Sequence, residues 1–96
     1  MATVRLYDKD YNDMQMDFIF RNYNVIKASD EYIVVDAPSH VIGKLKQSAH
    51  KTNEEFSKNF PSFFEEFLMM YNSVIKVGDE GLTIERLKEL FNYENS

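Results

Sequence analysis

The chain is 96 residues long, the size of one domain (residues 1–96) built around one hydrophobic core. It carries 16 acidic and 11 basic side chains, a formal net charge of -5, and no cysteine. A disulfide framework and a thiolate metal site are therefore excluded, and the acidic balance disfavours binding to phosphate backbones. No apolar run approaches the ~20 residues that span a bilayer, and the N-terminus lacks the apolar run of a signal peptide. We therefore expect a cytoplasmic protein with no membrane partner.

The first half of the chain predicts a small antiparallel sheet. Residues 3–7 alternate between polar and apolar side chains, which is typical of a short strand. Residues 24–28 and 31–36 are strand-like and are separated by a polar turn, so they predict a hairpin. Residues 14–23 fit the periods of both a helix and a strand. The acidic residues that precede them favour a helix, whereas a strand would make this half a four-stranded meander.

The second half of the chain predicts helices. Ser39 can cap a helix whose apolar stripe includes Leu45. Thr52 and Glu55 have the spacing of a capping box, which predicts the start of another short helix. That helix ends near residue 59, because the ring of Pro61 blocks its continuation.

Residues 60–77 concentrate aromatic and methionine side chains in one helix-length segment. Ser62 and Glu65 have capping-box spacing and predict a helix over residues 62–73. Its apolar side chains fall on two adjacent stripes: Phe63, Phe67, Met70 and Val74 on one, and Phe64, Leu68, Tyr71 and Ile75 on the other. Two stripes make an apolar face wider than one small helix can cover. The segment is therefore either the centre of the core or a core helix that also carries a docking surface.

The order of predicted elements defines the fold class. A short strand over residues 74–77, a glycine-containing turn and a last helix capped by Thr83 complete the chain. We predict an α+β domain, in which the N-terminal strand and the 24–36 hairpin form a small antiparallel sheet covered by helices concentrated in the C-terminal half. If residues 74–77 are a true strand, the alternative is the ferredoxin-like βαββαβ arrangement.

The residues that could bind a metal or a cofactor do not form a complete motif. Asp8, Asp10 and Asn12 match the first three ligand positions of a calcium loop. The sixth position is Asp13 instead of glycine, and the twelfth is Ile19 instead of glutamate. The glycines form no phosphate-binding loop either. We expect neither a metal nor a cofactor.

The candidate catalytic groups also have simpler explanations. His40 and His50 are ten residues apart, nearly opposite each other on a helix, so they do not share a metal. Neighbouring carboxylates such as Glu65 and Glu66 do not face each other across a cleft, as acid–base catalysis of glycoside cleavage requires. No nucleophile–base pair is apparent. We therefore expect that the protein is not an enzyme.

The composition of the C-terminal half favours a protein partner. Methionine and aromatic side chains are typical of protein interfaces, and a small core cannot easily hide so many of them. We predict a small acidic protein-interaction module, of the kind that phage inhibitors or regulators form, which self-associates or docks on a larger protein with a basic surface. The candidate partner-binding residues are Phe60, Phe63, Glu66, Met70, Asp79, Glu89 and Tyr93.

The alternative function is nucleic-acid binding through a basic patch. Lys44, Lys46, His50, Lys51 and Lys58 form the only basic concentration in the chain. This Lys44–Lys58 patch contains no arginine, the side chain that most often reads bases, and a solubilising helix face explains it equally well. We therefore expect protein rather than nucleic acid as the partner.

Overall fold

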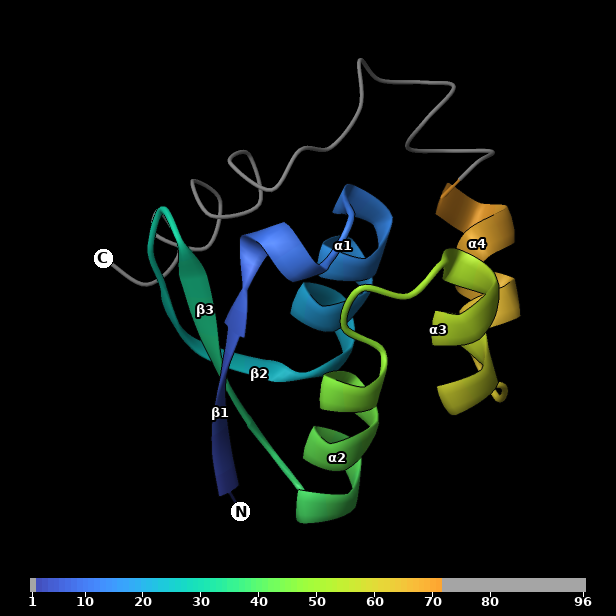
Figure 1. Cartoon of the computed structure of the whole chain (residues 1–96). Helices are drawn as coiled ribbons and strands as arrows, with labels where there is room; N and C mark the ends of the chain where they lie inside the picture. The colour runs from blue at the N-terminus through green and yellow to red at the C-terminus, as the bar shows by residue number, and fades with distance from the viewer. Residues whose placement is uncertain (1, 72–96) are drawn as a thin grey trace.

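The computed structural model describes residues 2–71, and in this part of the chain helices cover one face of an antiparallel sheet (Figure 1). The strands are β1 (Ala2–Tyr7), β2 (Asn24–Ala28) and β3 (Tyr32–Ala37). The helices are the 3-10 turn η1 (Asp8–Asp10), α1 (Asp13–Asn22), α2 (Ser39–Gln47), α3 (Asn53–Asn59) and α4 (Phe64–Met70). In Figure 1, α1 and α2 lie beside the sheet, and α3 and α4 lie farther from it. The predicted α+β class is confirmed, with α2, α3 and α4 all following the sheet in the sequence.

The sheet has the strand order β1-β3-β2, and β3 runs antiparallel to both neighbours. β1 and β2 are therefore parallel to each other, with α1 in the connection between them. This is the split β-α-β unit that the ferredoxin-like alternative requires for its first three strands. The fourth strand of that alternative, predicted at residues 74–77, and the last predicted helix lie outside the described residues.

The start of α1 shows why residues 14–23 form a helix instead of a fourth strand. Asn12 caps the helix: its side-chain oxygen accepts a hydrogen bond from the Gln15 backbone N–H at 2.8 Å. The Gln15 side chain accepts one in return from the Asn12 backbone N–H at 3.2 Å. This reciprocal capping box satisfies two backbone donors and fixes the first turn. The helical interpretation of this segment is confirmed.

Of the four predicted serine or threonine caps, one is confirmed, two are wrong, and Thr83 lies outside the described residues. Thr52 does cap α3, since its hydroxyl accepts from the Glu55 N–H at 3.3 Å. Ser39, however, is the first residue inside α2, and the carbonyl of Pro38 before it accepts the first helical hydrogen bonds. Ser62 lies in a turn before α4, which begins at Phe64 without a side-chain cap. Packing of the neighbouring aromatic rings, and not capping, sets this start.

Phe18 of α1 is the centre of an aromatic core. Its side chain is fully buried. Its ring centroid lies between 5.0 and 5.6 Å from those of Phe56, Phe60, Phe63, Phe64 and Phe67. The ring of Phe63 stacks on Phe18 with an interplanar angle of 15°. Burial of large rings supplies much of the hydrophobic free energy of a domain of this size. The segment between α3 and α4 therefore places the rings of Phe60 and Phe63 against Phe18.

The inner face of the sheet forms the other part of the core. Alternate residues of β1 and β3 are buried, as expected for a sheet with one face toward helices: Val4, Leu6, Ile33, Val35 and Ala37. Leu45 of α2 is also fully buried. The phenolic O–H of Tyr11 donates a hydrogen bond to the backbone carbonyl of Leu45, which ties the connection before α1 to α2.

One carboxylate is buried beside this core. The side chain of Asp17 is fully buried, and its Oδ1 accepts a hydrogen bond from the Arg21 Nε at 2.8 Å. Burial raises the pKa of Asp17, and the Arg21 guanidinium opposes that rise. The pair fits the i, i+4 spacing of an ion pair within α1. Among residues 2–71, no helix is long and apolar enough to cross a membrane.

Candidate functional site

The outer face of α4 presents two large apolar side chains to solvent. Met69 is 71% exposed and Met70 is 42% exposed. Glu65 and Glu66 occupy the preceding turn of the same face and are also exposed. Side chains three or four residues apart are neighbours on a helix, so these four residues form one continuous surface. We call this surface, made of Glu65, Glu66, Met69 and Met70, the Glu–Met face.

The position of the Glu–Met face follows from the residues that α4 buries. Phe64 and Phe67 are 1% and 6% exposed and pack on Phe18, and Tyr71 just after the helix is 7% exposed. These three residues define the inner side of α4. With the inner side fixed by rings, the intervening glutamates and methionines turn outward. Phe64, Phe67 and Tyr71 are therefore core residues, whereas Leu68, which the sequence places on the same stripe as Phe64 and Tyr71, is only partly buried.

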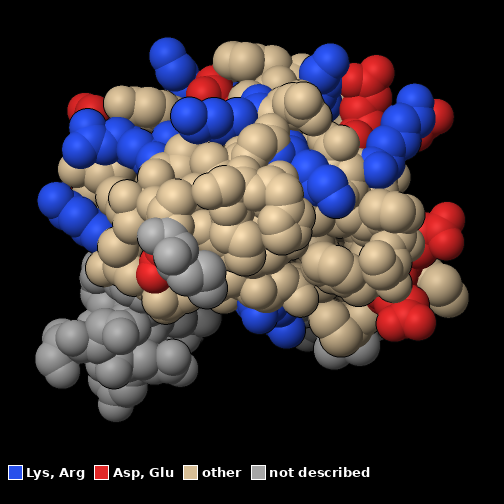
Figure 2. Space-filling view, turned by 90° about the horizontal axis from the view of Figure 1, so that it is seen from below, with Lys and Arg blue, Asp and Glu red and all other residues tan. Residues whose placement is uncertain are grey.

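Acidic side chains are concentrated on the same end of the molecule. Glu54 and Glu55 of α3 are exposed, as are the two glutamates of α4. Figure 2 shows most of the acidic groups visible in that view at the side where α3 and α4 lie in Figure 1. Glu55 pairs with Lys51 at 3.3 Å. Within the described part of the chain, Glu54, Glu65 and Glu66 have no ion-pair partner.

The structure separates the predicted partner-binding residues into three groups. Glu66 and Met70 are exposed and belong to the Glu–Met face. Phe60 is only 3% exposed and Phe63 is half-buried against Phe18, so Phe60 belongs to the core and not to a surface. Asp79, Glu89 and Tyr93 lie outside the described residues.

Most aromatic rings of α3 and α4 are buried, contrary to the expectation that a small core could not hide them. The α3–α4 rings that were expected in part at the surface are absorbed by the cluster around Phe18. Met69 and Glu65 were not among the predicted partner-binding residues, although a signal was available. Both fall on the side of the helix opposite Phe64 and Phe67, which helical spacing alone could have shown.

The alternative Lys44–Lys58 patch lies along the α2–α3 junction. A groove of about 400 Å³ between these helices is lined by Gln47, Lys51, Glu55, Lys58 and Asn59. Lys44, Lys46, Lys51 and Lys58 are all exposed. The ion pair with Glu55 partly neutralises Lys51, however, so the groove mixes both charges. This arrangement weakens the case for an anion site at this position.

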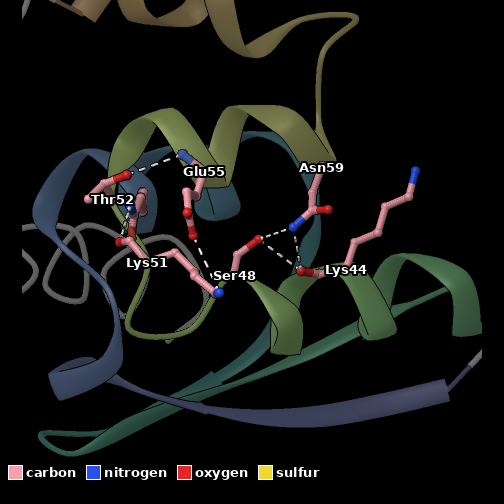
Figure 3. Close-up of polar contacts among 7 residues, drawn as sticks. Lys44, Ser48, Lys51, Thr52, Glu55 and Asn59 are labelled. Carbon is pink, nitrogen blue, oxygen red and sulfur yellow. Dashed lines mark hydrogen bonds and ion pairs between the residues drawn. The ribbon is translucent and has the colours of Figure 1, made fainter.

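Polar contacts around this groove hold α2 and α3 together (Figure 3). The amide of Asn59 donates to the Ser48 hydroxyl at 2.7 Å, and that hydroxyl donates to the Lys44 carbonyl at 2.9 Å. The side chain of Lys44 extends away from these contacts in Figure 3. Ser48 is fully buried, so its hydrogen bonds satisfy a polar group that would otherwise destabilise the fold. These contacts explain the polar residues of the junction as structural.

His50 and the N-terminal aspartates have structural partners. His40 and His50 are both exposed. His50 has a positive φ of 61°. Its backbone N–H donates a hydrogen bond to the backbone carbonyl of Asp10, and its ring Nε2 lies 2.8 Å from a carboxylate oxygen of Asp10. Asp8 and Asp10 belong to the 3-10 turn that leads into α1. Within residues 2–71, no three histidine or acidic side chains are grouped as a metal site would require.

No model of a known protein family, no curated protein and no solved structure matches the chain. The side chains that the fold leaves at its surface are therefore the indication of function. Among the described residues, the large hydrophobic side chains that are clearly exposed are Tyr7, Ile26, Met69 and Met70. Met69 and Met70 lie on the Glu–Met face, and Tyr7 and Ile26 lie on strands of the sheet.

Proposed function

We propose that this protein is a non-enzymatic interaction module that docks on a basic surface of a larger cytoplasmic protein, as an inhibitor or regulator would. The contact surface is the Glu–Met face of α4. The observation that carries the proposal is the exposure of two adjacent methionines, Met69 at 71% and Met70 at 42%, beside acidic side chains. Adjacent exposed apolar side chains with a polar rim are typical of interaction surfaces.

The side-chain chemistry of the Glu–Met face indicates what kind of partner it suits. Methionine is unbranched and polarisable, so it adapts its shape to an apolar partner surface. Glu65 and Glu66 are free to attract basic side chains, since neither is paired within the described residues. Complementary charge raises the rate of encounter and makes association sensitive to salt. A helix with leucines on one side and lysines on its borders combines both features.

A synthetic 18-residue amphipathic peptide of leucine and lysine provides a defined probe. We expect titration calorimetry to show binding to the full chain. Met69→Ser with Met70→Ser should weaken binding roughly tenfold or more, as loss of an interface anchor does. Glu65→Gln with Glu66→Gln should mainly reduce the dependence of affinity on salt. The control is Asp30→Asn with Glu31→Asn, which removes the same charge from the β2–β3 turn and should leave affinity within twofold of wild type.

A pull-down with the full chain from its native host, read by mass spectrometry, identifies the partner. The proposal predicts a protein retained by the wild type and by the turn control, and lost with the double methionine variant. Equal retention by all three proteins would show that the contact surface lies elsewhere. Equal binding of the synthetic peptide by all variants would likewise contradict the proposal.

A further inference from the structure

The face of the sheet opposite the helices carries a group of aromatic and basic side chains. Tyr7 is 38% exposed, and Arg5 of the same strand and Lys27 of β2 are also exposed. Arg5 and Lys27 are both register partners of Val34 in β3, and Tyr7 is the partner of Tyr32. These residues, Arg5, Tyr7, Lys27, Tyr32 and Val34, form what we call the sheet platform.

The contacts within the sheet platform centre on Tyr32. The rings of Tyr7 and Tyr32 meet edge to face, with centroids 6.0 Å apart and an interplanar angle of 62°. The Cζ of Arg5 lies 4.3 Å from the centroid of Tyr32, and the Nζ of Lys27 lies 5.7 Å from it. Cross-strand contacts of this kind stabilise a sheet, yet they leave the cations and the Tyr7 ring open to solvent. Two positive charges therefore lie over an aromatic surface on the central strand.

The charges around the sheet platform differ from those of the rest of the molecule. Within the described residues, neither Arg5 nor Lys27 forms an ion pair. Asp36 lies on the same face two residues beyond Val34, and Glu31 precedes Tyr32 at the turn, so carboxylates border the platform without contacting its cations. Figure 2 shows several Lys and Arg side chains on the side where the sheet lies in Figure 1. The sheet platform itself carries the two positive charges of Arg5 and Lys27, although the whole chain has a net charge of -5.

We propose that the sheet platform binds single-stranded nucleic acid, a second binding activity separate from the Glu–Met face. Unpaired bases stack on aromatic rings and on the plane of an arginine guanidinium, and the platform offers Tyr7 together with Arg5 held over Tyr32. Lys27 and Arg5 supply positive charge for the adjacent phosphates. The chemistry selects single strands, because a duplex hides the faces of its bases. It does not select a base sequence, since every base has a face that can stack.

The small number of cations sets the expected salt dependence. If Arg5 and Lys27 contact about two phosphates, affinity should fall roughly sevenfold between 50 and 200 mM salt, from the single-strand slope per phosphate contact. The overall negative charge opposes binding, so measurements start at about 50 mM salt, where electrostatic attraction is least screened. This slope is an expectation for the sheet platform alone. The four lysines of the Lys44–Lys58 patch would give a steeper one.

Fluorescence anisotropy with a labelled twelve-nucleotide oligothymidylate tests the proposal on the full chain. We expect saturable binding at 50 mM salt and none to a duplex of the same length. Tyr7→Ala should weaken binding about fivefold or more, the loss of one stacked base. Arg5→Gln with Lys27→Gln should weaken it further and flatten the salt dependence. The matched control, Lys44→Gln with Lys46→Gln, removes the same charge from α2 and should change affinity less than twofold.

Urea unfolding of each variant verifies that it is folded before binding is compared. If Tyr7→Ala is unfolded, Tyr7→Leu replaces it, since leucine keeps an apolar side chain without an aromatic face. Three results would overturn the proposal. They are no binding by the wild type at 50 mM salt, an equal loss of affinity in the α2 control, and equally effective competition by an oligoglutamate peptide, which would show attraction of charge without stacking.

Discussion

The two aromatic regions of the molecule have opposite relations to solvent. The segment from Phe56 to Tyr71 has the highest density of rings, and most of them are buried around Phe18. The strands β1 and β3 carry few rings, yet Tyr7 is exposed on the open face of the sheet. Ring density along the sequence therefore does not indicate surface exposure. What decides exposure is whether a second layer of structure packs on the face that carries the ring.

This contrast explains why the candidate binding surfaces are not the most hydrophobic segments. The rings of helix α4 are buried in the core, and its Glu–Met face is exposed to solvent. The aliphatic residues on the inner face of the sheet are buried in the core, and its tyrosines and cations lie on the outer face. In both cases the side chains left at the surface combine charge with apolar area, which favours recognition of a partner over aggregation.

The largest expected loss of stability comes from a substitution in the buried aromatic region. Phe18→Ala should lower the free energy of unfolding by about 3–5 kcal/mol, because it removes a fully buried ring that contacts several others. That is a large part of the ~5–15 kcal/mol that stabilises a small domain. Urea denaturation followed by circular dichroism measures it. Tyr7→Ala on the open sheet face should cost only about 1 kcal/mol, and equal costs for the two variants would contradict the contrast.

A second variant tests how the helical layer is held together. Gln15 is 1% exposed, and its side-chain amide donates to the Asn53 side chain at 3.0 Å, which links the start of α1 to α3. Gln15→Ala should cost about 1–3 kcal/mol, because it leaves buried hydrogen-bonding groups without a partner. Gln47→Ala at an exposed position of α2 is the control and should be close to neutral. A neutral Gln15→Ala would mean that the link is not formed in solution.

The sequence predicted the strands and most helices because their periodic patterns are local. Residues 3–7 and the 24–36 hairpin were placed correctly, and α3 was predicted from its Thr52 cap. The start of α4 was misplaced because stacking of Phe63 on Phe18 joins residues 45 positions apart, an interaction that no local pattern shows. Phe60 was assigned to the surface for the same reason. The sheet platform was missed because it depends on the register that sets Tyr7 opposite Tyr32.

The capping predictions can be separated by experiment. Thr52→Ala should lower the free energy of unfolding by about 1 kcal/mol, because the Thr52 hydroxyl caps α3. Ser39→Ala and Ser62→Ala should change it by less than about 0.5 kcal/mol, since neither side chain caps a helix and both are exposed. Thermal or urea denaturation of the three variants measures the differences. An equal loss of free energy of unfolding in Ser62→Ala and Thr52→Ala would show that Ser62 does cap a helix, as its capping-box spacing predicted.

The effect of Asp17→Asn on stability should depend on pH, which tests whether the Asp17 carboxyl is buried in the folded protein. Burial raises the pKa of Asp17 above its ordinary value of 3.8, so protonation of Asp17 favours folding. That contribution is complete below the unfolded pKa and is lost as pH rises through the higher folded pKa. Asparagine does not ionise, so the stability of Asp17→Asn relative to wild type should increase as pH rises from about 3.5 to 7. Urea denaturation at several pH values tests this, and a difference that stays flat or decreases would contradict it.

The most direct test of the central claim, that α4 turns its rings inward and its methionines outward, is the solvent exposure of the methionine methyl groups. In a sample with 13C-labelled methionine methyls, a soluble paramagnetic agent broadens exposed signals more than buried ones. Among the methionines of residues 2–71, we expect the strongest broadening for Met69, then Met70, weaker broadening for the partly buried Met14, and almost none for Met16, which is 0% exposed. Met69 and Met70 signals protected to the same degree as Met16 would show that the Glu–Met face is covered, and would contradict the account.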